Sequence, residues 1–162
     1  MIYPVKNAIG NVIADPQDPP VHQHGRPTWA DIDLSALHHN LGQVNNLLHP
    51  GQRVMAVVKA DAYGHGAVPI SRELVRAGIS DFAVATLEEA QTLRYAGIEG
   101  NLLVLGGCFP GQEEIFIRDR LMPALLDLDT AERLNAVVVL CRQQICVHLK
   151  VDSGMGRVGF TP

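Results

Sequence analysis

The stretch Val54-Met55-Ala56-Val57-Val58-Lys59 places an unbroken apolar run directly before a lysine. The run has the length of a strand, and no polar residue alternates with its apolar residues. A strand that is apolar on both faces is typical of a parallel sheet covered on each side. This stretch therefore predicts a buried parallel strand that ends at Lys59.

The alternation of helix and strand continues on both sides of this stretch. Before it, apolar residues recur every three or four positions from Leu34 to Leu47, which predicts a helix ended by Pro50 and Gly51. After it, further apolar runs of strand length begin near residues 82, 102, 123 and 145, with helix-like segments between them. The chain is therefore predicted to be an α/β protein with about five strands.

Two of the intervening helices carry capping signals. Thr86 and Glu89 have the spacing of a capping box, in which each residue hydrogen-bonds the backbone N–H of the other. Asp129 and Glu132 have the same spacing before a helix whose apolar side ends at Cys141. We therefore expect these two helices to be capped by Thr86 and Asp129.

The spacing of the strands limits the possible folds. A strand-and-helix unit that repeats every 20 to 28 residues is the rhythm of a parallel barrel or of a doubly wound sheet. A complete eight-unit barrel needs about 250 residues in the typical case, whereas this chain has 162. The rhythm therefore predicts either an incomplete barrel or a finished open sheet, and does not choose between them.

The composition fits a globular domain and excludes several classes of partner. Hydrophobic residues make up 47% and charged residues 19%, which argues against disorder through most of the length. A formal net charge of -4 provides no basic surface for nucleic acid or an anionic membrane. The sequence has no apolar run long enough to span a bilayer, and its first residues do not resemble a secretory signal. We expect a cytoplasmic protein that binds neither nucleic acid nor membrane.

Residues 1–26 differ from the remainder of the chain. Prolines interrupt them and they sustain no apolar period, so they are predicted to form a loose extension before a domain at residues 27–162. His22 and His24 lie in this extension. Two histidines in such a segment are usually solvated residues rather than ligands. No metal site is predicted.

The three cysteines point to a reducing compartment. Cys108, Cys141 and Cys146 are odd in number and fit no metal-binding spacing. We expect them to serve as small core residues. A free reactive thiol is the functional alternative.

Lys59 is the first residue that the fold does not explain. It stands at the carboxyl end of the most apolar strand, where sheets of this class place their active sites. An ammonium group there must be paired, have its pKa lowered, or lose its charge by forming an imine. The alternative without a function is a lysine that reaches the rim of the sheet and pairs with Asp61.

Residues 56–66, Ala-Val-Val-Lys-Ala-Asp-Ala-Tyr-Gly-His-Gly, closely resemble the pyridoxal-phosphate attachment segment of alanine racemases. The resemblance begins at residues 29–34 and continues through residues 103–106 to residues 148–160, in the right order. It therefore covers essentially everything after residue 26. Asp61 is a small departure, because many relatives carry asparagine there.

The resemblance implies a racemase that interconverts L-alanine and D-alanine with pyridoxal 5'-phosphate and supplies D-alanine for peptidoglycan. In that family the lysine at the Lys59 position holds the cofactor covalently and acts as the base on one face of the substrate's α-carbon. The tyrosine at the Tyr63 position holds the cofactor phosphate. The lysine at the Lys150 position is carbamylated in many members. It orients the arginine at the Arg157 position, which faces the substrate carboxylate and the phenolic oxygen of the cofactor.

The resemblance also implies that this sequence is the N-terminal portion of a (β/α)8 barrel. Alanine racemases are homodimers that complete the barrel and add a C-terminal β domain, absent here. That domain supplies a tyrosine as the base on the opposite face. Because inversion needs a proton donor on each face, these 162 residues alone are expected to have little or no racemase activity. The alternative is a non-catalytic barrel fragment that binds pyridoxal phosphate.

A competing motif overlaps the segment that contains Arg157. Residues 154–159 carry glycine at the first, third and sixth positions and follow a predicted strand, as in the dinucleotide-binding fingerprint. That fingerprint should follow the first strand of its unit and open a helix. Here the predicted strand is the fifth, so nucleotide binding is the less favoured interpretation.

Overall fold

The computed structural model describes residues 5–6, 12–13 and 30–162. Two short strands near the N-terminus, β1 (Val5–Lys6) and β2 (Val12–Ile13), pair antiparallel, and β1 pairs parallel with β3 (Ile32–Asp33). The rest of the predicted extension over residues 1–26, with His22 and His24, lies outside the described residues. The expectations for that segment stay predictions.

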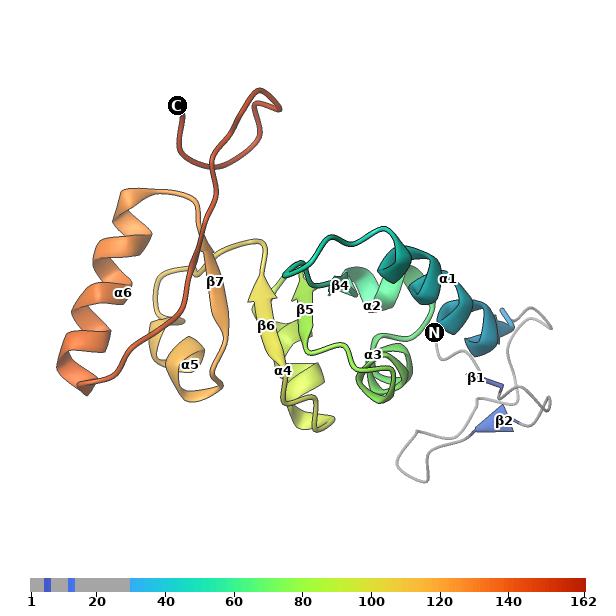
Figure 1. The fold of residues 1–162 in the computed structure, drawn as a ribbon. Coiled ribbons are helices and arrows are strands. Elements are labelled where there is room, and N and C mark those ends of the chain that lie inside the picture. The colour runs from blue at the N-terminus through green and yellow to red at the C-terminus, as the bar shows by residue number, and fades with distance from the viewer. Residues whose placement is uncertain (1–4, 7–11, 14–29) are drawn as a thin grey trace.

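Five further strands form one parallel sheet. They are β4 (Met55–Val57), β5 (Asp81–Val84), β6 (Asn101–Val104), β7 (Met122–Leu125) and β8 (His148–Leu149). Their order in the sheet is β4-β5-β6-β7-β8, the same as in the chain (Figure 1). A doubly wound sheet reverses this order at a switch point, whereas a barrel does not. The sheet therefore has the order of a barrel, and it stays open, with β4 and β8 at its edges.

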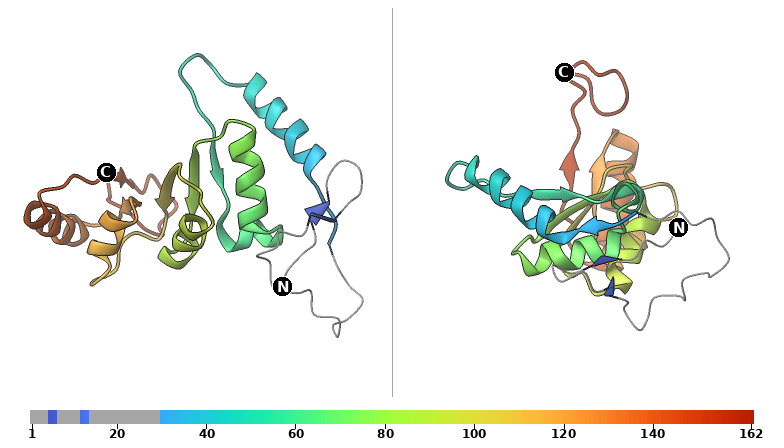
Figure 2. Two further views of the ribbon diagram at one scale, coloured as in Figure 1. Left: turned by 90° about the horizontal axis from the view of Figure 1, so that it is seen from below. Right: turned by 90° about the vertical axis from the view of Figure 1, so that its right-hand side faces the viewer.

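Helices connect the successive strands. They are α1 (Leu34–Asn46), α2 (Lys59–Gly64), α3 (Ala67–Arg76), α4 (Leu87–Tyr95), α5 (Glu113–Arg118) and α6 (Leu128–Cys141). The helix α1 lies at the β4 end of the row and α6 lies at the opposite end (Figures 1 and 2). No helix in the described part of the chain is long and apolar enough to cross a bilayer.

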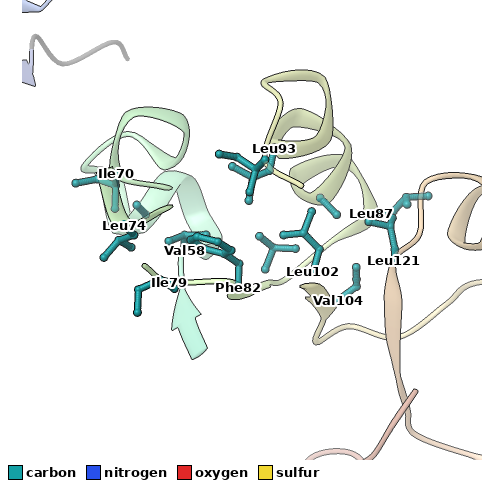
Figure 3. Close-up of a cluster of buried hydrophobic side chains, with 14 of the residues drawn as sticks. Val58, Ile70, Leu74, Ile79, Phe82, Leu87, Leu93, Leu102, Val104 and Leu121 are labelled. Atoms are coloured by element: carbon teal, nitrogen blue, oxygen red, sulfur yellow. The ribbon is translucent and has the colours of Figure 1, made fainter. Parts of the chain in front are cut away.

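The main core lies between the sheet and its helices. Phe82 of β5 and Leu102 and Val104 of β6 are almost completely buried and pack with Leu93 of α4 (Figure 3). Val84 of β5 is also fully buried and belongs to the same cluster. These strand residues alternate along the chain, so they share one face of the sheet. Burying large apolar side chains of this kind is the main favourable contribution to folding.

The opposite face of the sheet carries a second, smaller cluster. Its buried members are Ala83, Leu103 and Ala124, one from each of three neighbouring strands. They are the residues between those of the main core, so their side chains point away from the helices. In a closed barrel this face lines the interior. The two faces therefore differ as the outer and inner faces of a barrel do.

The start of α6 differs from the prediction. The N-cap is Asp127, whose Oδ1 accepts from the backbone N–H of Thr130 at 2.7 Å, and Asp129 lies in the first turn. The prediction of Asp129 as the cap is therefore wrong by two residues. Two aspartates two positions apart can each act as a cap, and Asp127 is the one that has the extended backbone of an N-cap residue.

The fifth strand is shorter than predicted. The apolar pattern predicted a strand over residues 145–151, but the ladder contains only His148–Leu149 and both residues are exposed. Because β8 is an edge strand, only β7 pairs with it. The prediction for the cysteines holds for Cys108, which is buried, and is wrong for Cys141 and Cys146, which are exposed at this end of the sheet.

Arg94 of α4 binds the connections that lead into two strands, at the edge of the sheet where the strands begin. Its guanidinium donates to four backbone carbonyl oxygens at 2.6 to 2.9 Å, those of Ile98, Gly100, Asp119 and Arg120. The first two carbonyls precede β6 and the other two precede β7. One side chain thus fixes the positions at which two neighbouring strands start.

We predict that Arg94→Met lowers the free energy of unfolding by about 2 kcal/mol or more, because four carbonyls lose a charged donor. The control is Arg76→Met, since Arg76 is exposed on α3 and pairs with Glu73. That variant should change the stability by no more than about 0.5 kcal/mol. Urea unfolding followed by circular dichroism measures both, and equal losses would contradict the assigned role of Arg94.

Candidate active site

Both candidate lysines lie at the edge where the parallel strands end. Lys59 follows β4, whose pairing extends to Val58 through a 2.8 Å hydrogen bond from its N–H to the Ala83 carbonyl. Lys150 follows β8 and its own N–H donates to the Leu125 carbonyl at 3.0 Å. Because the strands are parallel, the ends of the first and the fifth face the same way.

Directly after Lys59, the element α2 is a left-handed turn rather than a right-handed helix. Ala60, Asp61, Ala62 and Tyr63 have φ between 51° and 55° and ψ between 36° and 49°. None of them is glycine, and left-handed helix costs L-residues about 1–2 kcal/mol each. Strain of this kind persists only where the surrounding structure holds it, and it gathers at functional sites. We call residues 60–63 the left-handed turn.

Part of what holds the turn lies beside it in the chain. The Asp61 carboxylate accepts from the backbone N–H of Ala67, the first residue of α3, at 2.6 Å. The Asp61 carbonyl accepts from Gly66 N–H at 2.9 Å, and Ala62 N–H donates to the Val58 carbonyl at 2.9 Å. The Ala62 side chain is buried. The turn is therefore anchored to both β4 and α3.

The remaining anchor comes from α4. Oε1 of Glu89 accepts from Ala60 N–H at 2.7 Å, and Oε2 accepts from Ala85 N–H at 2.7 Å. Thr86 caps α4 as predicted, because its Oγ1 accepts from Glu89 N–H. The predicted hydrogen bond from Thr86 N–H to the Glu89 carboxylate is wrong, since both Glu89 oxygens accept from Ala60 and Ala85 instead. The capping signal marked Glu89 in the sequence but did not show this role.

Lys59 has no ionic partner among residues 30–162. Its side chain is half-buried, and its ammonium group makes no hydrogen bond or ion pair with that part of the chain. Asp61, the partner considered from the sequence, is engaged by α3 instead. The non-functional alternative, a Lys59–Asp61 pair at the rim, is therefore contradicted. An amine in this position can react with a carbonyl carbon.

Tyr63 and His65 lie at the same end of the site as Lys59. Tyr63 is 61% exposed, so it is accessible to a ligand. His65 Nδ1 donates to the Ala62 carbonyl at 2.8 Å, so this side chain binds the turn from two residues beyond its end. Tyr63 is thus available for binding, and His65 has a structural contact.

The second group of candidates lies in a loop after β8. The Lys150 amine donates to the Val151 carbonyl at 3.1 Å, and the loop closes where Phe160 N–H donates to the Lys150 carbonyl at 2.8 Å. Within it, backbone N–H groups of Gly156 and Gly154 lower the pKa of Asp152. Arg157 is exposed on this loop, which projects from the sheet in Figure 1.

No helix forms over residues 152–162, so the glycine pattern at 154–159 lacks the helix N-terminus that a dinucleotide pyrophosphate requires. The local geometry instead is a loop folded back onto Val151. The competing interpretation of this motif as a nucleotide site is therefore not supported by the backbone.

The structure does not bring the two groups into contact. Among residues 30–162, no hydrogen bond or ion pair joins Lys59 or Tyr63 to Lys150 or Arg157. Three strands separate β4 from β8. At a spacing of about 4.8 Å for each pair of strands, that is about 19 Å along a flat sheet. Bending the sheet towards a closed barrel shortens this separation.

Cys108 lies in the loop that follows β6, at the same edge. Burial, with a contribution from the Glu113 carboxylate, raises the pKa of its thiol to about 11. The thiol is therefore protonated at neutral pH, and the thiolate is the nucleophilic form of cysteine. The alternative of a reactive thiol is not supported at this position.

Comparison with known proteins gives a consistent result for the sequence. Residues 32–162 match the family model described as alanine racemase, N-terminal domain. The alanine racemase of Desulforamulus reducens is 43% identical over 136 residues, which cover 84% of this chain and 37% of that protein. The alanine racemase of Halothermothrix orenii is 45% identical over 137 residues, which cover 85% of this chain and 36% of that protein.

Solved structures give the same result for the fold. Alanine racemase of Clostridium difficile 630 superposes with a TM-score of 0.80 at 37% identity, over 86% of this chain and 38% of that one. The Bartonella henselae alanine racemase, solved with covalently bound pyridoxal phosphate, gives a TM-score of 0.73 at 30% identity and covers 80% of this chain and 36% of its own. A histidine racemase from Leuconostoc mesenteroides gives 0.73 at 30% identity, over 79% of this chain and 34% of its own.

These matches confirm the prediction of the N-terminal portion of a barrel with five of its strands. The chain spans only about 37% of the length of the relatives that it matches. The match nevertheless extends over most of the present sequence, from residue 32 to residue 162. The chain therefore belongs to the alanine racemase family, and its residues 32–162 match the N-terminal domain of that family.

Proposed function

We propose that this chain carries the lysine half of a pyridoxal-phosphate-dependent active site that racemises alanine. The observation that carries this proposal is the Lys59 amine, which has no ionic partner among residues 30–162 and follows the end of β4. Family membership supports it, as does the relative with covalently bound pyridoxal phosphate. Activity of the whole enzyme is part of the proposal, because the chain spans about 37% of its relatives.

The groups present fit the proposed cofactor. The Lys59 amine is available to react with an aldehyde, and the exposed Tyr63 hydroxyl is available to donate to a phosphate. The Arg157 guanidinium suits a carboxylate or a phenolic oxygen. Pyridoxal phosphate, when bound, supplies a conjugated ring that accepts the electron pair left behind by a departing α-proton.

Lys59 then acts as a base on one face of the substrate. Its Nζ takes the α-proton from that face and can return it to the same face. The anchored turn fixes the backbone next to this amine, so the proton acceptor is held at one position relative to β4. Inversion requires a second proton donor on the opposite face. In the proposed enzyme, that donor is a tyrosine outside residues 1–162.

Lys150 and Arg157 are proposed to recognise the substrate carboxylate. The Lys150 amine donates only to a backbone carbonyl among residues 30–162, so it is available for carbamylation. A carbamate would replace repulsion between two cations with a charge-assisted pair to the guanidinium. The pair would fix the planar donor fork of Arg157, which matches a carboxylate.

Alanine is proposed as the substrate because the two curated relatives described above are alanine racemases. A histidine racemase has a comparable fold over most of this chain. The fold of this part of the chain therefore occurs in racemases that act on different amino acids. We further propose a homodimer in the cytoplasm that supplies D-alanine for peptidoglycan. These assignments follow from family membership.

We predict that adding pyridoxal phosphate gives a visible absorption band, and that borohydride converts it to a stable adduct at Lys59. Mass spectrometry of the reduced, digested protein locates the modified residue. Lys59→Ala should abolish the band, whereas the control Lys150→Ala should retain it, because Lys150 lies at a different strand end. A folded parent chain that shows no band would remove the cofactor from the proposal.

Tyr63→Phe should weaken cofactor binding about tenfold, which corresponds to about 1.4 kcal/mol for the lost hydrogen bond to phosphate. Fluorescence titration with pyridoxal phosphate measures the affinity. Because the side chain is 61% exposed, the urea midpoint should stay unchanged. The same substitution at the exposed Tyr95 of α4 is the control, and an equal effect there would contradict the role of Tyr63.

The 162-residue chain with bound pyridoxal phosphate should exchange the α-hydrogen of one alanine enantiomer with deuterium oxide and retain its configuration. Inversion should be at least about 100-fold slower than exchange, the lower end of the usual effect of one general acid or base. Proton NMR measures exchange, and chiral chromatography measures inversion. Racemisation at the rate of a complete enzyme would contradict the single-base description, and cofactor binding without exchange would favour the non-catalytic alternative.

A further inference from the structure

We propose that Glu89 is a positioning residue, whose carboxylate holds the left-handed turn against the end of β5 and thereby sets the position of the Lys59 amine. The inference rests on the proposed function of Lys59. Glu89 belongs to α4 and lies 29 positions after Ala60, so the contact joins two separate units of the sheet. The carboxylate is a structural link between the ends of β4 and β5.

The two carboxylate oxygens of Glu89 have different partners. Oε1 accepts from Ala60 N–H and Oε2 accepts from Ala85 N–H, each at 2.7 Å. Ala60 is the first residue with positive φ after Lys59, and Ala85 is the residue directly after β5. The distances are those of charge-assisted hydrogen bonds. Glu89 therefore binds the backbone at Ala60, where the left-handed turn begins.

A purely local role would give a different geometry. In a capping box, the carboxylate at this position returns to the N–H of the N-cap residue and stabilises its own helix. Here Thr86 caps α4 through its hydroxyl, and the Glu89 carboxylate contacts two N–H groups outside that helix. The arrangement satisfies a donor in the strained turn rather than one at the start of α4.

Loss of the carboxylate would leave the turn without this support. Ala60 N–H has Glu89 as its acceptor, and an unsatisfied backbone donor in a strained conformation favours relaxation of that conformation. The bonds from Asp61 and Ala62 hold the middle of the turn and would remain. Relaxation should therefore begin at Ala60, next to the amine of Lys59.

The test compares Glu89→Gln with Glu88→Gln in the full chain. Glutamine removes the charge and keeps one acceptor oxygen, but its NH2 group cannot accept from the second backbone N–H. Glu88 is an exposed residue in the same first turn of α4, so its substitution changes the same charge near the same helix N-terminus. Of these two glutamates, only Glu89 accepts hydrogen bonds from the N–H groups of Ala60 and Ala85.

Amide hydrogen exchange, measured by NMR in the protein without cofactor, is the first readout. Glu89→Gln should accelerate exchange at Ala60 or Ala85 at least tenfold, and Glu88→Gln should leave both amides unchanged. The second readout is the rate at which pyridoxal phosphate forms the borohydride-stable adduct at Lys59, which should fall at least tenfold in Glu89→Gln alone. Urea unfolding of both variants separates these local effects from global destabilisation.

The proposal is overturned if both amides keep the protection of the parent chain in Glu89→Gln, or if Glu88→Gln reproduces its effects. If Glu89→Gln does not fold, Glu89→Asp replaces it, because the shorter carboxylate keeps the charge and can reach only one of the two amides. Retained protection at both amides in that variant would also overturn the proposal. If the parent chain forms no adduct, the proposed function of Lys59 fails, while amide exchange still tests the link made by Glu89.

Discussion

Parallel pairing of five strands in chain order is the constraint on which the rest of this structure depends. It brings all the strand ends to one edge of the sheet, and it puts Lys59 and Lys150 on that edge although 91 positions separate them in the sequence. The same pairing assigns alternate strand residues to two faces. One face packs against helices through Phe82 and Leu102, and the other carries the small cluster around Leu103.

The two edges of the sheet are stabilised in different ways. Where the strands begin, Arg94 binds four backbone carbonyl groups, and only Arg120 among the non-glycine residues of those connections has a positive φ. Where the strands end, the backbone after Lys59 adopts a left-handed conformation that four non-glycine residues rarely share. Hydrogen bonds from Asp61 and Glu89 hold that conformation. Four consecutive left-handed residues at one edge and a network of arginine–carbonyl hydrogen bonds at the other agree with the usual division of α/β barrels into a functional and a stabilising face.

Much of the fold could be predicted because its signals are local. The apolar run at residues 54–58 and the Thr86 cap each report on a few neighbouring residues, and both form the predicted elements. The predicted burial of the strand is wrong for Val57, which is exposed because β4 lies at the edge of the sheet. Errors arose where distant segments decide the outcome. Asp127 rather than Asp129 caps α6, and the edge position of β8 shortens it to His148–Leu149. The site residues were identified by their resemblance to a family. The hydrogen-bond partners of Asp61 and Glu89 could not be identified in this way, because Asp61 binds the first residue of α3 and Glu89 binds residues outside its own helix.

The sequence by itself determined the repeat of strand and helix, the lysine at the end of the most apolar strand, and the family to which the chain belongs. The spacing of apolar residues and the residue sequence of a motif are properties of neighbouring positions in the chain, so they can be recognised without coordinates. Only the tertiary structure decided that the strands follow the order of a barrel, that the turn after Lys59 is left-handed, and that Glu89 reaches Ala60. The strand order and the Glu89 contact depend on hydrogen bonds between segments about twenty or more residues apart, and such contacts exist only once the sheet has brought those segments together. The left-handed turn combines one such contact with hydrogen bonds to its neighbours in the chain.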